Sequence, residues 1–567
     1  MKKILAFALA VMLVLLCCAC GETTETKKPA NNDSTGNDTV VSEVESENNS
    51  SEEEVPNGSV TVGDTLYESV IVDEESVVNF KPVESGGLTG LETPWDADTL
   101  KTKGYSDEIA AKRREEIVNT PNTMDIYGDK ITGKVYYVSP NGDDHNDGLT
   151  PETAIQTLDA DFFYMKSAKP GDAVLFERGG IWRVTNKFKP LEGVTYGSYG
   201  KGAKPSFYAS AYNYADPYFW MPSTRENIWK INIADEDVGL IVMNHGEAVG
   251  VKSLNGLITL SKNFDYYFNK NEDLLYMYYD GGNPGKAFED IEIGLNMPIV
   301  GLTKAENVTI DNMTFKYSGR FGIDACGCDG LVISNCEFGF IGGAIHSSTT
   351  RLGNAIQVWN GVKNHTIYNN WIYQIYDTGL TWQGDNEWTG ASHMSDVYEN
   401  ITYEKNLLEY CAMSIEVWHG NWEYDGNGNA TYTDKYETRA KLTNFKVIDN
   451  ISRLPGWGWS VQRPDPTGSH WMSYQHVFPN AKGCEVTGNI FDSAYVYPVR
   501  WQMLSNTVEN KRNGEWNISG NYWYQQPSRA NNGLWYNGIQ DTISNQGTCQ
   551  TSVGRFDTNP AEVKWFE

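Results

Sequence analysis

The sequence is poor in basic residues and lacks the signatures of several enzyme classes. Its 567 residues contain 45 Lys and Arg against 74 Asp and Glu, a formal net charge of -29, which argues against a nucleic-acid or anionic-membrane partner. No nucleotide-binding loop, nucleophilic serine motif or HExxH motif is present. No spacing of Cys and His matches a zinc site, so we expect no cofactor and no metal centre.

Cysteine is too sparse to build a disulfide scaffold in a chain of this length. Six cysteines follow residue 58, and we expect them to be small buried residues with one incidental bridge at most. They are Cys326, Cys328, Cys336, Cys411, Cys484 and Cys549.

The N-terminal region has the pattern of an export signal followed by a linker. Residues 1–20 place two lysines before an apolar run too short for an ordinary membrane span. The segment LLCCACG resembles the lipobox of bacterial lipoproteins, which implies that Cys20 is acylated and anchors the protein at the bacterial cell surface; an ordinary secretory signal is the alternative. Residues 21–58 predict a disordered acidic tether. We therefore expect an extracellular monomer that touches the membrane only through its lipid.

A short strand-like pattern closed by asparagine recurs from residue 307 onward. Examples are NVTIDNMTF at 307, TIYNNWIY at 366 and CEVTGNIFD at 484. A variable period with a constant core is typical of a solenoid with loops inserted at one corner. No helix-length periodic stretch separates the units, so the pattern predicts an all-β parallel β-helix with asparagines stacked at one turn. The stacked asparagines would be Asn370, Asn406, Asn450, Asn489 and Asn521, spaced by 36, 44, 39 and 32 residues.

A second recurring phrase supplies one strand from each of five coils: GIDAC at 322, AIQVW at 355, GLTWQ at 379, SIEVW at 414 and GWSVQ at 458. Strand side chains alternate between two faces, so alternate positions share a face. The interior set is Ile323, Ile356, Leu380, Ile415, Trp459, Ala325, Val358, Trp382, Val417 and Val461. The outward set is Asp324, Gln357, Thr381, Glu416, Ser460, Cys326, Trp359, Gln383, Trp418 and Gln462.

The outward set has the composition of a sugar-binding groove. Flat indoles stack on pyranose rings, and amides bind hydroxyl groups. A sheet surface that is merely rich in Trp is the alternative. The predicted substrate-binding residues are Asp324, Gln357, Trp359, Gln383, Trp418, His419, Gln462, Arg463 and Arg500.

Glu416 is the one glutamate of the outward set and is the predicted catalytic acid. Glycoside hydrolysis needs a proton-donating carboxyl group and a second carboxylate, and partial burial would raise the pKa of Glu416 and suit it to donation near neutral pH. Asp324 lies three coils away, about 14 Å at the usual strand spacing. The second carboxylate must therefore come from a turn, and Asp385 and Asp377 are the candidates, provided that their loops bend inward.

Two other functions remain open. A polysaccharide lyase acting by β-elimination needs a base and positive charge to neutralise a uronate, and Arg463, Arg500, His419 and Arg351 could supply them. A non-catalytic glycan-binding lipoprotein would need the stacking residues without a carboxylate pair.

The segments YYVSPNGDDHNDGLTPETAIQTL (136–158), PGDAVLFERGGIWR (170–183) and YGSYGKGAKPSF (196–207) resemble the opening of the pectate-lyase-like superfamily. LLYMYYDGGNP (274–284) and IYDTGLTWQGD (375–385) are most similar to its glycoside hydrolases. The resemblance implies a right-handed parallel β-helix over residues 134–525 that acts on polysaccharide or oligosaccharide. We expect a β-rich insertion at about 208–300, an N-terminal extension at 59–133 and a C-terminal cap at 526–567.

Three local features complete the prediction. NGDDHNDG at 141–148 is a turn cluster; as a calcium loop it would be irregular, because Gly148 stands where Asp or Asn is required. Residues 152–168 are amphipathic and predict a helix that seals the end of the solenoid. Residues 106–118 predict an outer helix with Ser106 as its N-cap.

Overall fold

The computed structural model describes residues 59–62, 65–68, 106–157, 167–347, 350–385, 397–420, 422–424, 430–432, 441–464, 468–474, 481–502, 515–527, 532–536 and 539–566. The signal segment, Cys20 and the tether lie outside these residues, as do the side chains of Asp385 and His419. Within the described part of the chain, no helix has the length and apolar character needed to span a membrane.

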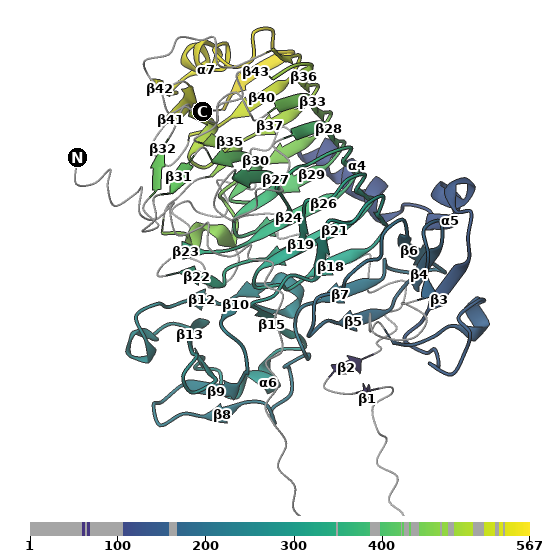
Figure 1. Cartoon of the computed structure of the whole chain (residues 1–567). Helices are drawn as coiled ribbons and strands as arrows, with labels where there is room; N and C mark the ends of the chain where they lie inside the picture. The colour runs from purple at the N-terminus through teal and green to yellow at the C-terminus, as the bar shows by residue number, and fades with distance from the viewer. Residues whose placement is uncertain are drawn as a thin grey trace, which may run out of the picture.

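Three long sheets form the body, and from β16 to β41 the chain visits them in a fixed order, coil after coil (Figure 1). Every pairing within them is parallel except the last pair of the nine-stranded sheet, β41 with β42. This arrangement confirms the predicted parallel β-helix. The nine-stranded sheet contains β16 (Val300–Thr303), β19 (Phe321–Cys326), β24 (Asn354–Trp359), β27 (Thr378–Asp385), β30 (Met413–Gly420), β35 (Ser469–Tyr474), β38 (Tyr497–Gln502), β41 (Asn532–Tyr536) and β42 (Ile539–Thr542).

The other two sheets have ten strands each. One contains β3 (Val135–Val138), β4 (Ala173–Glu177), β6 (Thr195–Tyr199), β17 (Thr309–Asp311), β20 (Val332–Ser334), β25 (Thr366–Tyr368), β28 (Val397–Glu404), β33 (Lys441–Ile448), β36 (Cys484–Thr487) and β39 (Trp516–Ser519). The other, which we call the outer-helix sheet, contains β5 (Ile181–Arg183), β7 (Ser206–Tyr208), β18 (Thr314–Lys316), β21 (Glu337–Ile341), β26 (Trp371–Ile375), β29 (Leu407–Glu409), β34 (Ile451–Arg453), β37 (Ile490–Asp492), β40 (Tyr522–Gln525) and β43 (Glu562–Trp565).

An asparagine ladder runs along the turn between the two ten-stranded sheets. The side-chain amide of Asn370 donates to Asn406 Oδ1 at 2.9 Å, and Asn406 donates to Asn450 at 2.9 Å. Asn450, Asn489 and Asn521 continue the series at 3.0 and 2.8 Å, and all five are buried. The ladder satisfies polar groups that the tight turn would otherwise leave buried without a partner. The predicted asparagine stack is therefore confirmed.

The coil interior is apolar and aromatic. Trp382 is fully buried there, with its ring centroid 4.7 Å from that of Tyr398. The six cysteines are free and buried, so the incidental disulfide is absent among the described residues.

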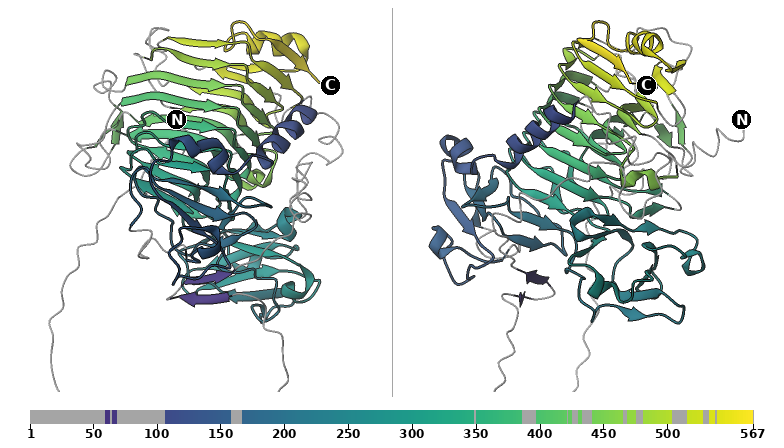
Figure 2. Two further views of the ribbon diagram at one scale, coloured as in Figure 1. Left: turned by 90° about the vertical axis from the view of Figure 1, so that its right-hand side faces the viewer. Right: turned by 180° about the vertical axis from the view of Figure 1, so that it is seen from behind.

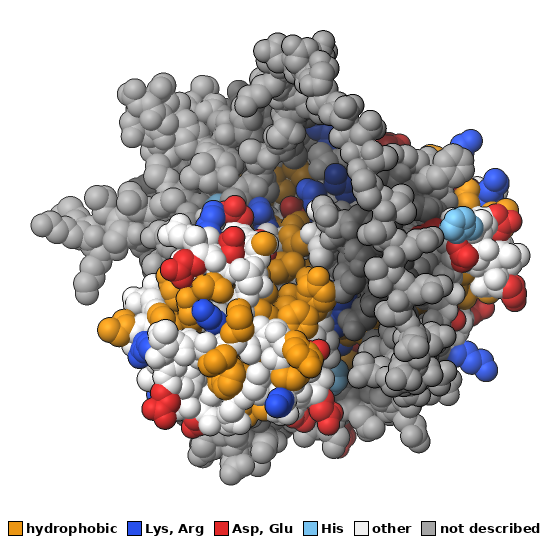
Figure 3. All heavy atoms as spheres, turned by 90° about the horizontal axis from the view of Figure 1, so that it is seen from below, with side chains coloured by type: hydrophobic (Ala, Val, Ile, Leu, Met, Phe, Trp, Pro, Cys, Tyr) orange, Lys and Arg blue, Asp and Glu red, His pale blue; other side chains and the backbone are white. Residues whose placement is uncertain are grey.

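A β-rich segment between β7 and β16, which we call the insertion, packs on the first coils of the outer-helix sheet (Figure 1). Figure 3 shows apolar side chains among polar ones on the lower side of the molecule. Within the insertion, Tyr218, Met221 and Ile258 are exposed. It holds α6 (Pro284–Ala287) and two sheets. They are β12 (Val251–Lys252), β13 (Asp265–Asn269), β14 (Leu274–Tyr278), β9 (Ile228–Asn232) and β8 (Met221–Pro222), and then β11 (Ala248–Val249), β10 (Val238–Met243) and β15 (Ile291–Leu295).

Helix α4 (Asp107–Val118) lies across the outer-helix sheet (Figure 2), which confirms the predicted outer helix. Arg114 donates to both carboxylate oxygens of Glu409 on β29 at 2.9 and 2.8 Å. Ser106 is the N-cap residue, as predicted, but its side chain makes no capping bond, and its hydroxyl donates to the Asp492 carboxylate. The remaining helices are α5 (Thr123–Tyr127) and α7 (Gln546–Val553).

The predicted sealing helix at 152–168 is wrong over its described beginning. Only Pro151–Thr153 forms a single 3-10 turn, and Ile155 then bridges Val138 in extended backbone. The Asp144 carboxylate accepts the backbone N–H groups of Gln156 and Thr157 at 2.9 and 2.8 Å, which holds this stretch out of a helix. Residues 158–166 lie outside the described part of the chain.

Candidate active site

Four of the five aligned strand copies pair as the sequence predicts. Asp324 pairs with Gln357, Gln357 with Thr381, and Thr381 with Glu416. Glu416 lies on β30 and is only half-buried, whereas its neighbour Thr381 is fully buried. The predicted interval of three coils between Asp324 and Glu416 is therefore confirmed.

The fifth copy is wrong. Residues 458–462 do not enter the sheet: Trp459–Gln462 form a 3-10 helix, η8, and β35 takes the place beside β30. Trp471, rather than Trp459, continues the interior column from Ile415. Trp459 packs outside the coil, because its backbone N–H and its indole N–H donate to Gln374 Oε1 and O at 3.1 and 2.7 Å.

The two outward tryptophans are more buried than an open sugar platform would be. Trp359 is 3% exposed and Trp418 is 7% exposed, and their rings stack on each other with centroids 5.6 Å apart. They belong to strands on either side of β27, whose Gln383 lies in the same outward column between them. The stacked indoles therefore bury each other's faces beside Gln383 and leave little aromatic surface exposed.

Glu416 is held by neutral donors on the neighbouring strand. Gln383 Nε2 donates to its carboxylate at 2.6 Å, Thr381 Oγ1 at 3.3 Å and Thr378 Oγ1 at 3.5 Å. Burial raises the pKa of Glu416 to about 7, and the negative charge of Asp377 acts in the same direction. The bonds from Gln383 and Thr381 and the charge of Arg463 oppose that rise. A carboxyl group in this state exchanges its proton near neutral pH.

Asp377 stands immediately before β27, where its backbone bonds to two neighbouring coils. Its N–H donates to Gly353 O, and its carbonyl accepts from Met413 N–H, both at 2.9 Å. Arg463 Nη1 donates to Asp377 Oδ1 at 2.5 Å. The charge of Asp377 acts on Glu416, so the two carboxyl groups lie within electrostatic reach of each other.

Arg463 lies beside Asp377 because η8, which precedes it, packs against the end of β26 and Tyr376. Its guanidinium lies 5.5 Å from the ring of Tyr376, and that of Arg351 lies 4.2 Å from the same ring. The ion pair was not predictable from the strand pattern, since Arg463 follows a segment that the pattern assigned to the sheet.

The remaining predicted residues are scattered over the face. Asp324 is half-buried, and burial raises its pKa against the opposing charges of Arg320 and Lys187. Arg500 continues the column of Glu416 beyond Met472, and its guanidinium lies 4.8 Å from the Trp535 ring.

Two predicted polar residues, Gln357 and Gln462, have other settings. Gln357 is buried and accepts a bond from Asn354. Gln462 bonds to the backbone of the insertion rather than lining the sheet. For Asp385 and His419 the strand pairing is described, with Asp385 opposite Gly420 and His419 opposite Gly384.

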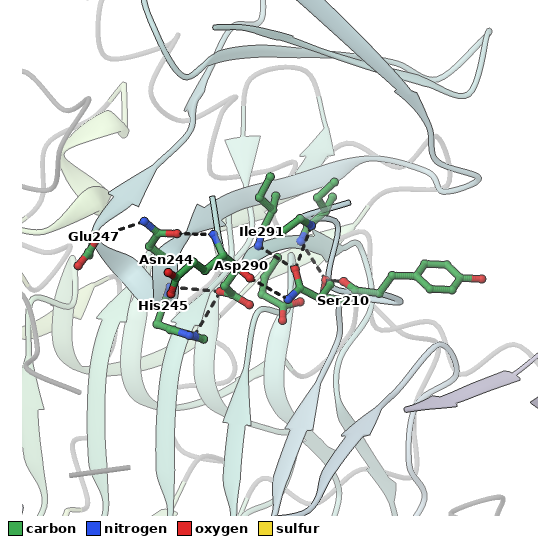
Figure 4. Close-up of polar contacts among 12 residues, drawn as sticks. Ser210, Asn244, His245, Glu247, Asp290 and Ile291 are labelled. Carbon is green, nitrogen blue, oxygen red and sulfur yellow. Dashed lines mark hydrogen bonds and ion pairs between the residues drawn. The ribbon is translucent and has the colours of Figure 1, made fainter. Parts of the chain in front are cut away.

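A second buried carboxyl cluster lies where the insertion meets the outer-helix sheet (Figure 4). Asp290 Oδ2 accepts the His245 backbone N–H at 3.2 Å, and Glu292 accepts both Nη atoms of Arg183 at 2.8 and 3.0 Å. Burial raises the pKa of Glu292 to about 7, opposed by Arg183. Among the described residues, no group of three His, Cys, Asp or Glu side chains could hold a metal ion.

No family model matches the chain, and no curated protein matches it. Among solved structures it is similar to a complex of XylC with xylose (12% identity, 69% of this chain, 76% of that chain, TM-score 0.34) and to a glycoside hydrolase (9%, 76%, 96%, TM-score 0.36). It is also similar to a rhamnogalacturonan lyase (11% identity, 73% of this chain, 87% of that chain, TM-score 0.33). Similarities this low carry no argument about function, and the fold rests on the strand pairing itself.

Proposed function

We propose that the protein is a glycoside hydrolase that cleaves polysaccharide or oligosaccharide on the outer face of the nine-stranded sheet. The observation that carries the proposal is the pair Glu416 and Asp377: the charge of Asp377 helps to raise the pKa of Glu416 to about 7, so that Glu416 is about half protonated at pH 7, and Asp377 is ion-paired with Arg463. Neighbouring carboxyl groups whose surroundings differ in this way are the usual basis of acid and base assignment.

In this mechanism Glu416 donates its proton to the glycosidic oxygen as the bond to the leaving group breaks. Thr381 and Gln383 orient the carboxyl group from the adjacent strand. Asp377 stays negatively charged beside Arg463 and acts either on water as a base or on the anomeric carbon as a nucleophile. Asp385 remains the other candidate for this second role.

The rest of the face would bind the glycan. Asp324 extends the site along the column of Glu416 with a half-buried carboxyl group. His419 and Arg500 are further proposed contacts with the sugar, whereas Gln357, Trp359 and Trp418 are buried against other protein groups. The proposed setting is the cell surface, with the chain anchored through Cys20.

A lyase is the alternative function, and the setting of the arginines counts against it. A β-elimination base must be free to take a proton, but Arg463 is paired with Asp377 and Arg500 lies over Trp535. The exposed positive charge that would neutralise a uronate is thus reduced at both positions.

The test is a glycan panel treated with the purified chain, with reducing ends and the ultraviolet absorbance of an unsaturated product read in parallel. A hydrolase releases reducing ends without the chromophore, whereas a lyase produces both. We expect Glu416→Gln to lower turnover by about 100-fold or more with glycan affinity retained. Glu485→Gln, at a half-exposed position on a neighbouring sheet, is the matched control. Full turnover by Glu416→Gln would contradict the assignment.

A further inference from the structure

The helix η8 is attached to the insertion, more than two hundred residues earlier in the chain. The side chain of Gln462 makes two bonds with β12 and the residue before it. Its Oε1 accepts the backbone N–H of Lys252 at 3.2 Å, and its Nε2 donates to Gly250 O at 2.9 Å. One side chain therefore fixes the end of η8 through both its donor and its acceptor.

Apolar packing at the other end of η8 also involves the insertion. Trp459 is fully buried in a cluster that includes Leu240 and Val242 of β10. Its ring lies 5.1 Å from that of Tyr376, the residue before Asp377. At Gly343 an added Cβ would come within 2.2 Å of Gly239 O and 2.9 Å of the Trp459 ring, so the three segments meet without room for a side chain.

Buried charged groups lie near the contact between the insertion and the turn after β21. Lys252 Nζ is ion-paired with Asp237 and donates to Val238 O at 2.7 Å. Arg351 Nε donates to Gly343 O at 2.7 Å. Two further bonds join the insertion to the turn after β21: Lys252 Nζ donates to Gly343 O at 3.4 Å, and the Ile345 N–H donates to Asp237 Oδ2 at 2.6 Å. Breaking a buried ion pair of this kind is costly.

Arg463 directly follows this anchored residue, and its guanidinium bonds to Asp377. We propose that the insertion forms the outer wall of the candidate active site, and that Gln462 is a positioning residue that holds Arg463 against Asp377 and so sets the charge beside Glu416. The effect of Gln462 on catalysis rests on the proposed function, whereas its effect on the ionisation of Glu416 does not.

The physical consequence is a change in the ionisation of Glu416. The charged groups that act on it are Asp377, before β27, and Arg463, after η8. When Gln462 releases η8, Arg463 moves away from Asp377. The negative charge of Asp377 is then screened less than before, and Glu416 loses the direct attraction of Arg463. Both effects favour the protonated form of Glu416.

The experiment uses the full chain with Gln462→Met, which keeps the volume of the side chain and removes both bonds. Carbodiimide activation in the presence of an amine labels protonated carboxyl groups, and peptide mass spectrometry follows Glu416 as the pH is varied. We expect the labelling midpoint to rise by about half to one pH unit, and by about one to two units in Arg463→Met. The high-pH limb of kcat/KM should move in the same direction. Lys270→Ala breaks an exposed ion pair with Glu236 within the insertion. This control should change neither the labelling midpoint nor the high-pH limb of kcat/KM.

The outcomes separate the two proposals. An unchanged midpoint in Gln462→Met, with a lowered melting temperature, would make Gln462 a structural residue only and overturn the inference. If Gln462→Met fails to fold, Gln462→Asn, which is too short to keep both bonds, decides the matter by the same labelling. A wild-type chain that cleaves no glycan would overturn the proposed hydrolase, and the labelling midpoints would still decide the positioning role.

Discussion

Replacing Glu416 by Gln should stabilise the protein at high pH, although it removes the proposed catalytic acid. The pKa of Glu416 is raised from an ordinary value of 4.5 to about 7, mainly by burial. Between these values the folded protein binds a proton that the unfolded chain does not. The stability from the protonated carboxyl group is therefore fully present below about pH 4.5 and is lost as the pH rises through about 7. Gln cannot ionise, so the variant avoids this loss.

The size of the effect follows from the shift. A rise of about 2.5 pKa units, at about 1.4 kcal/mol per unit, corresponds to about 3 kcal/mol. The difference in the free energy of unfolding, variant minus wild type, should grow by roughly that amount between about pH 4.5 and about pH 8. Urea unfolding followed by tryptophan fluorescence at several pH values measures it, with Glu485→Gln as the control. A difference that stays constant with pH would show that Glu416 has an ordinary pKa and would remove the basis of its assignment as the acid.

Three further predictions follow from the packing and the sequence. Trp418→Ala should lower the free energy of unfolding by about 3 to 5 kcal/mol, because the ring is buried in a stacked pair, and calorimetry checks it; a large loss of glycan affinity without loss of stability would mean that the ring lies open. Asn406→Ala should cost about 2 to 5 kcal/mol by leaving buried ladder groups without partners, whereas Asn517→Ala, at an exposed position with one exposed contact, should cost well under 1 kcal/mol in the same urea titration. Cys20→Ser should release the protein from membranes, and membrane association as firm as before in cell fractionation would rule out the lipid anchor.

The coil of this protein could be predicted from its sequence because the same local rule acts in every turn. Alternation in a strand separates Ile415 from Glu416 wherever the strand lies. The buried asparagine at each turn has a neighbour in left-handed backbone, such as Asn369 with φ of 54° before Asn370, and Asn tolerates this conformation better than most residues. Because the strand alternation and the asparagine turn recur in every coil, these individually weak signals together predict the fold.

The prediction of the site was weaker because it depends on contacts between distant segments. Alternation identifies the side chains that leave the coil, but it does not say which of them remain in contact with solvent. Trp359 and Trp418 point outward as expected and are nevertheless buried against each other. Trp459 satisfied the strand pattern as well as Trp471 did, and bonds to Gln374 place it outside the sheet instead.

The raised pKa of Glu416 therefore depends on the segments packed around β30 as well as on its position in that strand. A carboxyl group on the open face of a β-sheet is solvated and keeps an ordinary pKa. Around Glu416, burial removes water and Asp377 adds a like charge, while Arg463 limits the rise. Arg463 reaches Asp377 because Gln462 ties η8 to the insertion. A related coil with the same outward column and no insertion should accordingly lack the restraint from Arg463, and its glutamate should keep its proton to higher pH.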